Sequence, residues 1–77
     1  MIHYKVIDRV GDKVLIQEVN SSVVEECIML ENIGRDDITL YDILGKLLAT
    51  DAPISNSQLK IGFDFYVDSV VPLSVFV

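Results

Sequence analysis

The side chains that most often perform catalysis are scarce in this sequence. His3 is the only imidazole and Cys27 the only thiol among 77 residues. A lone histidine near the start of a predicted strand is more often a solvated side chain than a general base. Cys27 stands among Val24, Ile28 and Met29, and apolar surroundings raise the pKa of a thiol and make it unreactive. We therefore expect Cys27 to lie in the core and neither residue to act as a catalyst.

Carboxylates are plentiful, but their spacing does not build a reactive site. Glu25-Glu26 and Asp36-Asp37 are neighbouring pairs of a kind found on solvated faces and at helix starts. Asp64 and Asp68 stand on one predicted strand, about 13 Å apart along it, too far to share a proton or a metal ion. No glycine-rich phosphate loop, Cys-x-x-Cys or His-Glu-x-x-His motif is present. The sequence predicts a protein that is not an enzyme, with no catalytic residue, cofactor or metal.

Composition limits the classes of partner. The chain has 12 acidic and 6 basic side chains and a formal net charge of −6, which argues against direct binding to nucleic acid, since phosphates require clustered lysine and arginine. No run approaches the roughly 18 apolar residues of a membrane span. Residues Met1 to Lys5 lack the apolar core of a signal peptide. We expect a cytoplasmic protein, a single domain over residues 1–77, with no membrane contact.

The chain combines small size with a high apolar content. Hydrophobic residues make up 51% of the 77, and a domain of this size buries only about 60% of the surface of its unfolded chain. Some apolar side chains therefore lie at the surface or are covered by another chain. We predict a protein partner or a homo-oligomer.

The first nineteen residues predict a β-hairpin. Apolar and polar residues alternate over Ile2–Val10, and Gly11-Asp12 is a two-residue turn of a common hairpin type. This turn would place Ile7 opposite Ile16. The residues expected to face the core are Ile2, Tyr4, Val6, Val10, Leu15 and Val19.

Residues 20–34 allow two interpretations. Ser22 and Glu25 fit a capping box at the start of a helix over 22–32. The apolar run over 27–30 fits a buried strand instead, and the β-branched residues that precede it favour a strand over 24–31. We predict the strand and keep the helix as the alternative.

Residues 37–49 have the spacing of an amphipathic helix. Asp37 can cap its start, Lys46 lies near its negative end, and Pro53 follows its end. The apolar stripe of this predicted helix consists of Leu40, Tyr41, Leu44, Leu47 and Leu48.

The last third of the chain predicts two strands. Asp68-Ser69 is the expected turn between them, and Pro72 places the final strand at an edge or a bulge, because proline cannot donate to a ladder. The alternating residues predicted to face the core are Ile61, Phe63, Phe65 and Val67.

The order of these elements predicts a mainly β protein of the α+β class. We expect a small antiparallel sheet curled into an OB- or SH3-like five-stranded barrel, with one helix over 37–49. The alternative is a four-stranded antiparallel sheet with two helices, over 22–32 and 37–49.

Two fragments resemble a known family. Gly11-Asp12-Lys13-Val14-Leu15-Ile16-Gln17-Glu18 and Leu47-Leu48-Ala49-Thr50-Asp51-Ala52-Pro53 are similar to stretches of the small acidic phage inhibitors of uracil-DNA glycosylase. The likeness covers 15 of 77 residues. Those inhibitors begin with a helix, whereas Ile2–Val10 predicts a strand. The resemblance therefore implies a class of function, mimicry of DNA charge, and not membership of the family.

We expect a small acidic, non-catalytic protein–protein interaction module, such as an accessory, adaptor or assembly component. The alternative is a phage-type inhibitor of a nucleic-acid-handling enzyme, with carboxylates in place of phosphates. Residues 70–77 are almost wholly apolar, and an unprotected apolar strand edge pairs readily with another strand. The residues predicted to make the contact are Tyr66, Val71, Leu73, Val75, Phe76 and Val77.

Overall fold

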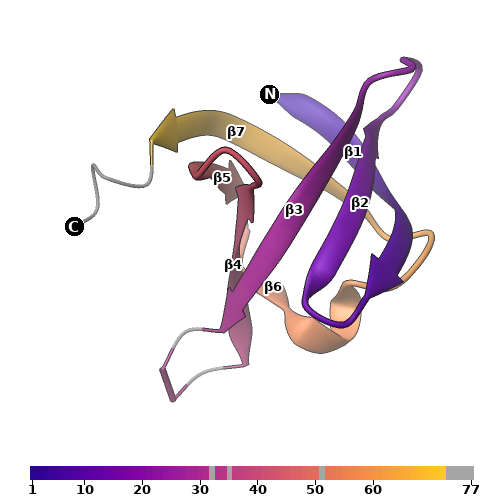
Figure 1. Ribbon diagram of the computed structural model, residues 1–77. Coiled ribbons are helices and arrows are strands. Elements are labelled where there is room, and N and C mark those ends of the chain that lie inside the picture. Colours follow the sequence, from indigo (N-terminus) through magenta and orange to yellow (C-terminus); the bar gives the residue numbers. More distant parts are fainter. Residues whose placement is uncertain (32, 35, 51, 73–77) are drawn as a thin grey trace.

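The chain folds into an antiparallel β-barrel (Figure 1). The computed structural model describes all residues except 32, 35, 51 and 73–77. Its elements are β1 (Ile2–Val10), β2 (Lys13–Glu18), β3 (Val24–Glu31), β4 (Asp37–Asp42), β5 (Lys46–Thr50), β6 (Ile54–Ser55), the 3₁₀ helix η1 (Asn56–Gln58) and β7 (Asp64–Pro72). The described residues form no α-helix.

Six of the strands close the barrel. They neighbour one another in the order β3-β2-β1-β7-β5-β4, and β3 also pairs with β4, so the sheet returns on itself. Every pair is antiparallel, and the two-residue β6 adds to β4. The predicted barrel is confirmed. The five strands with one helix are wrong, and so is the alternative sheet with two helices.

The β1–β2 hairpin turns at Gly11-Asp12, as predicted. Gly11 has a φ of 61°, in the left-handed region that glycine adopts without strain. A bulge at Ile7 then shifts the register, because Val6 pairs with Ile16 and Ile7 is skipped. The predicted pairing of Ile7 with Ile16 is therefore wrong.

The bulge changes which residues face the core. Tyr4 and Val6 are buried, as predicted, but β2 buries Val14 and Ile16 in place of Leu15. A one-residue shift moves every later side chain to the other face of a strand. Val10, Leu15 and Val19 were wrongly predicted as core for this reason. Ile2 was also wrongly predicted as core, because it begins β1 at the end of the barrel and is 38% exposed.

β3 covers the residues of the predicted strand over 24–31, so that prediction is confirmed and the helix over 22–32 is wrong. Cys27 and Met29 are buried, so the prediction that Cys27 lies in the core is confirmed. Ile28 and Leu30 alternate with them and point outward.

The predicted helix over 37–49 is wrong, because these residues form β4, a turn and β5. Leu40 pairs with Leu48 and Tyr41 with Leu47 across the two strands. These four residues lie symmetrically about the turn, so the spacing that makes a helical stripe also makes a hairpin with facing apolar pairs.

β7 is continuous through the predicted turn at Asp68-Ser69, which is therefore wrong. Phe65 and Val67 are buried as predicted, and Phe63 packs against the core while only partly buried. Ile61, predicted to be inside, is 67% exposed. It lies in the turn before the strand, where alternation no longer sets the direction of a side chain.

One bulge in β7 marks a change of partner. Residues 64–67 of β7 pair with β1, and residues 67–72 pair with β5. Thr50 pairs with Val67 and Ala49 with Ser69, so Asp68 is the extra residue. Bulges bend strands at barrel corners. The residues predicted to form a turn, Asp68 and Ser69, lie at this bulge.

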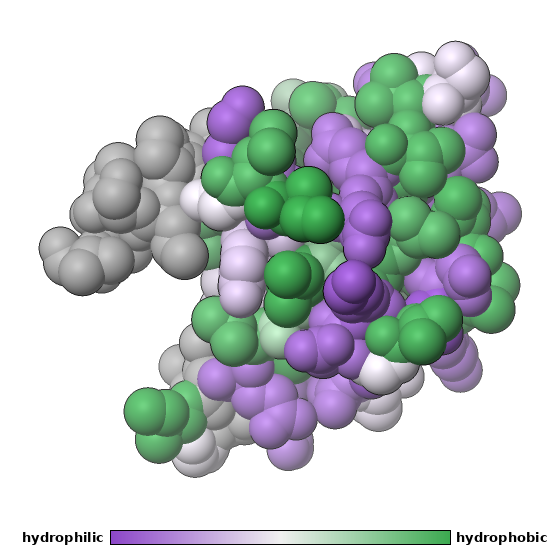
Figure 2. All heavy atoms as spheres, viewed as in Figure 1, coloured by the Kyte–Doolittle hydropathy of each residue, from purple (hydrophilic) through white to green (hydrophobic). Residues whose placement is uncertain are grey.

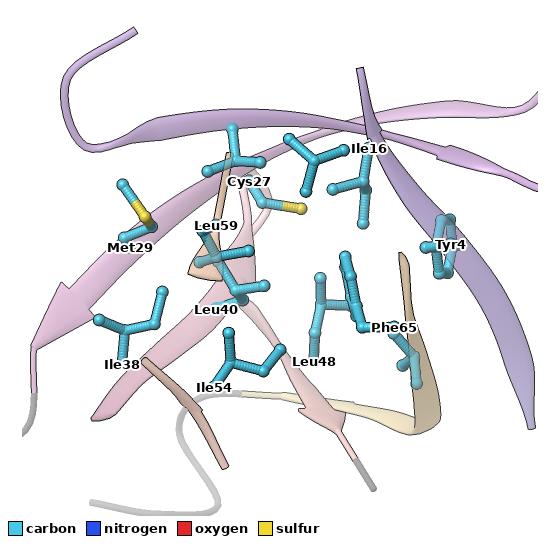
Figure 3. Packing of buried hydrophobic residues seen from close by; sticks show 13 residues of the cluster. Tyr4, Ile16, Cys27, Met29, Ile38, Leu40, Leu48, Ile54, Leu59 and Phe65 are labelled. Atoms are coloured by element: carbon cyan, nitrogen blue, oxygen red, sulfur yellow. The ribbon is translucent and has the colours of Figure 1, made fainter. Parts of the chain in front are cut away.

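Among the residues whose burial the structure describes, the core is a cluster of 13 buried hydrophobic residues, drawn in Figure 3. Leu59, just after η1, is fully buried and lies in the middle of the cluster near Leu40 and Cys27. Residues 55–58 are all polar, and Ile54, just before them, is also buried. This segment closes one end of the barrel.

Arg9 fixes that closing segment to the β1–β2 hairpin. Its guanidinium donates hydrogen bonds to the backbone carbonyls of Asn56 (2.9 Å) and Leu59 (2.6 Å), and also to the side-chain oxygen of Asn56. Charge-assisted bonds of this kind are the strong ones. The end of the barrel is therefore closed by packing and by polar contacts together.

Candidate interaction surface

His3 packs against the neighbouring strand. Its ring stacks on Tyr66 with the centroids 4.6 Å apart, and its Nε2 atom lies 3.5 Å from Oδ1 of Asp64. Within the part of the chain that the structure describes, no group of three or more His, Cys, Asp or Glu side chains is placed to hold a metal ion.

Cys27 is fully buried, and its surroundings suppress thiolate formation. Burial, and then the carboxylates of Glu25, Asp42 and Glu26, raise the pKa of the Cys27 thiol to about 12. Because the thiolate is the nucleophile, Cys27 is held at neutral pH in its unreactive form.

The end of the barrel opposite η1 is closed by a tyrosine and a glutamate. The Tyr4 hydroxyl donates a 2.8 Å hydrogen bond to Oε1 of Glu25. Burial, followed by this hydrogen bond to a carboxylate, raises the pKa of Tyr4 well above its ordinary value. Tyr4 is thus a neutral donor that ties β1 to β3.

The carboxylates lie at both ends of the barrel. Glu25 and Glu31 are at opposite ends of β3, about 20 Å apart along the strand. Asp36 accompanies Glu31 beside η1, whereas Asp42 lies opposite Cys27 toward the other end. These four carboxylates are therefore divided between the two ends of the barrel and not gathered at one.

A large surface groove lies beside η1 and is polar. It has a volume of about 660 Å³ and is lined by Arg9, Glu31, Asp36, Ser55, Asn56 and Ser57. Ligand pockets of similar size are usually apolar, with a few converging polar groups. Here the one cation, Arg9, already holds the backbone of η1, so the groove is not organised around a small molecule.

The predicted contact residues lie on or beyond β7. Tyr66 is 42% exposed and stacked on His3. Val71 pairs with Leu47 of β5, so its main chain is part of the barrel sheet. The sequence prediction treated Val71 only as a contact with another protein and did not include this pairing. Leu73, Val75, Phe76 and Val77 lie outside the described residues. The structure does not bring Tyr66 and Val71 together, since four residues of strand lie between them.

The turn between β4 and β5 is shaped by its own backbone and one carboxylate. Oδ1 of Asp42 accepts hydrogen bonds from the N–H groups of Leu44 (3.0 Å) and Lys46 (2.8 Å). The Gly45 N–H bonds to the Asp42 carbonyl at 3.0 Å, and Gly45 has a φ of 82°, which a side chain would make costly. The turn therefore holds its conformation without help from the other side chains at its tip.

Those other side chains are large, apolar and exposed. Ile43 is 60% and Leu44 78% exposed. The Ile43 N–H donates a 3.2 Å bond to the Glu26 carbonyl, so the tip is fixed to β3. Turns normally carry glycine, proline, asparagine, aspartate or serine, and two aliphatic residues at a rigid tip depart from that rule.

A row of apolar residues continues from this tip over the outer face of the barrel. Ile28 of β3 pairs with Tyr41 of β4, and Tyr41 with Leu47 of β5. All three are partly exposed and alternate with buried residues, so they point outward side by side. We call the five residues of this row and tip the hairpin surface: Ile28, Tyr41, Ile43, Leu44 and Leu47.

Charged residues border the hairpin surface. Lys13 pairs with Ile28 in the ladder and forms a 3.3 Å ion pair with Glu26, while exposed Lys46 precedes Leu47. Figure 2 shows apolar residues around the β4–β5 turn, interrupted and edged by hydrophilic ones. An apolar centre with a polar rim is the usual anatomy of a protein interface.

The sequence interpretation missed this surface, because it assigned Leu44 to the buried side of a helix. A signal was present: Asp42 and Gly45 stand at the first and last positions of a four-residue turn, where aspartate and glycine are favoured.

Comparisons of the chain with protein-family models, curated proteins and solved structures found no match. No helix among the described residues is long and apolar enough to cross a membrane.

Proposed function

We propose that this chain is a small, non-catalytic protein–protein interaction module that binds another protein through the hairpin surface. The observation that carries the proposal is the exposure of Ile43 and Leu44, at 60% and 78%, on a turn that Asp42 already holds. Asp42 and Gly45 shape the turn through their backbone contacts, so the two apolar side chains at the tip are available for binding.

The rigidity of the tip favours binding. A partner that covers a preorganised surface spends little free energy on ordering it. Ile43 and Leu44 project from the barrel as anchors, while Tyr41 and Leu47 supply flat apolar area behind them. Interfaces commonly gain most of their affinity from a few such central side chains.

The shape of the surface determines the kind of partner. A convex tip needs an apolar concavity. On the described part of this chain the groove beside η1 is polar, and the apolar hollow lined by Val10 and Leu15 has a volume of only about 180 Å³. We therefore propose a different protein that has an apolar groove, with acidic residues at its rim to meet Lys13 and Lys46. The alternative function, inhibition by DNA mimicry, is the weaker candidate because the described carboxylates lie at both ends of the barrel.

Site-specific photo-crosslinking in the native cells tests the proposal. A photoreactive amino acid replaces Leu44 in one version of the protein and Val10 in another. Val10 is 71% exposed and lies outside the hairpin surface, with Lys13 between it and Ile28, so it is a control matched for exposure. We expect a discrete adduct with one other protein from position 44 and not from position 10. The purified partner should then bind the wild-type chain and fail to bind Ile43→Asp.

Three results would contradict the proposal. Equal crosslinking from both positions would show nonspecific contact. An adduct of two copies of this chain would assign the hairpin surface to self-association. Full binding of the purified partner to Ile43→Asp, in a variant with an unchanged circular dichroism spectrum, would place the contact elsewhere.

A further inference from the structure

One edge of β7 is left without a partner along half of its length. β1 begins at Ile2, opposite Val67, and from Val67 onward β7 pairs only with β5. No described strand pairs with the other edge over residues 69–72. Figure 1 shows the arrowhead of β7 extending past the start of β1.

This edge has no charged side chain between its two ends. Main-chain N–H and C=O groups point alternately to the two sides of an antiparallel strand, so some of those in Ser69, Val70 and Val71 face away from β5. Natural edges are kept short or are blocked by charges, proline, bulges or cover. Residues 69–72 contain no charged side chain, and the bulge at Asp68 and Pro72 bound the open segment without blocking its middle.

We infer that β7 pairs with β7 of a second copy of this chain, in antiparallel orientation about a two-fold axis near Val70. An antiparallel pair of identical strands is self-complementary, as a two-fold interface requires. Centring the pair on Val70 places Asp68 of each copy opposite Pro72 of the other. The two Asp68 carboxylates then do not face each other, and Pro72 lies where the ladder ends.

A second observation supports the same edge. Met1 and Ile2 are large apolar residues, both exposed, at the start of β1, and Ile2 is the last residue of β1 to pair with β7. A second copy that extends the sheet beyond this point would cover them. The open edge of β7 and the exposed apolar residues Met1 and Ile2 therefore lie next to each other, and one bound copy would cover both.

The inference goes beyond the proposed function and does not depend on it. The hairpin surface lies on the side of β7 that faces β5, away from the open edge. A two-fold pair would carry two hairpin surfaces, and binding a partner with two sites would become bivalent.

Sedimentation equilibrium and amide hydrogen exchange of the intact chain test the pairing together. We expect the mean mass to rise toward that of a dimer at tens of micromolar, as expected where unpaired strand edges associate. The open-side amides within Ser69–Val71 should exchange more slowly as the concentration rises. Ser69→Lys should remain monomeric, whereas Ile61→Lys, the same charge change at an exposed site off the strand, should dimerise like the wild type.

Leu44→Asp separates this inference from the proposed function, because it should lose the partner and keep the dimer. The inference is overturned by a monomer at every concentration. It is equally overturned by a dimer whose newly protected amides lie outside β7, or by edge amides already protected in the monomer. The exchange measurement needs no variant, so it decides the question even if Ser69→Lys fails to fold.

Discussion

Two hairpin turns of this barrel differ in the polarity of their tips and in the contacts that their polar side chains make. The β1–β2 turn has a polar tip, Gly11-Asp12, and the adjacent Arg9 binds η1 through the carbonyls of Asn56 and Leu59. The β4–β5 turn has an apolar tip, and its shape depends on the Asp42 carboxylate.

The contrast separates residues that fold the chain from residues that are free for another use. Beside the β1–β2 turn, Arg9 is bound to the segment that closes one end of the barrel. At the β4–β5 turn, Ile43 and Leu44 face water although they are among the most apolar side chains of the chain. The first region should respond to mutation through stability, and the second through binding.

The largest expected effect is at the closed end. Leu59→Ala removes a fully buried side chain from the centre of the core, and a large-to-small core change costs about 2–5 kcal/mol of unfolding free energy. Urea denaturation of the variant measures this loss. Leu44→Ala is the same substitution at the exposed tip. If Leu59→Ala lowered the unfolding free energy by less than Leu44→Ala, the two regions would not differ in their contribution to stability.

The strictly alternating segments were predictable because one face of each is buried. The buried positions Phe65 and Val67 were obtained in this way, whereas the strand over 24–31 was predicted from its apolar run and the β-branched residues before it. The bulges at Ile7 and Asp68 were not, since a bulge depends on how a strand bends around the barrel and leaves no hydropathy signal. The faces of β2 and the continuity of β7 were missed for that reason.

The β4–β5 region was mispredicted because its apolar spacing satisfies two geometries. Leu40 and Leu48 are eight residues apart, which places them on one helical face or opposite each other in a hairpin. Only the local turn chemistry of Asp42 and Gly45 distinguishes the two. The hairpin surface was not predicted, because the predicted helix over 37–49 placed Leu44 on its buried face.

The next effect concerns the root of the β4–β5 hairpin, where Cys27 lies opposite Asp42. The pKa of Cys27 rises from 9.0 to about 12 on folding, so the folded state holds the proton more tightly. The stabilisation that the protonated thiol gives the folded state is complete below pH 9 and is lost as the pH rises from 9 toward 12. The unfolding free energy should fall by about 2–3 kcal/mol at pH 11 for this reason. Urea denaturation between pH 8 and 11 should show this fall.

Cys27→Ala is the control for that titration. It should be less stable at pH 8 but should lose the part of the pH dependence that the thiol causes. Native Cys27 should also react with a thiol reagent far more slowly than in denaturant. Equal rates would show that the root of the hairpin is as open as its tip.

Arg9→Met should weaken the closure of the polar hairpin by about 2 kcal/mol, because it leaves acceptor carbonyls of Asn56 and Leu59 without their charged donor. Methionine keeps most of the aliphatic length, so the loss reports the hydrogen bonds. Hydrogen exchange should speed up around η1 and stay unchanged in the β4–β5 turn. Exchange that rises equally in both regions would mean that the turns are not independent.

Asp42→Ala should cost about 1–2 kcal/mol, since its carboxylate accepts two backbone N–H groups of the turn. Asp42→Asn retains one acceptor oxygen and should recover part of the loss. Partner binding should weaken in Asp42→Ala even though Ile43 and Leu44 remain, because the tip is no longer preorganised. Unchanged affinity would show that the rigidity of the turn has no part in docking.

The smallest effect on stability should come from Leu44→Ala. Its side chain is 78% exposed and the turn is held by Asp42, so the unfolding free energy should change by less than about 0.5 kcal/mol. Binding of the partner should nevertheless fall by at least tenfold, as expected for the truncation of an interface anchor. Titration calorimetry against the crosslinked partner, set beside urea denaturation of the same variant, measures the two effects together. A variant that lost stability and kept its affinity would reverse the roles assigned to the two turns, because Leu44 would then serve the fold.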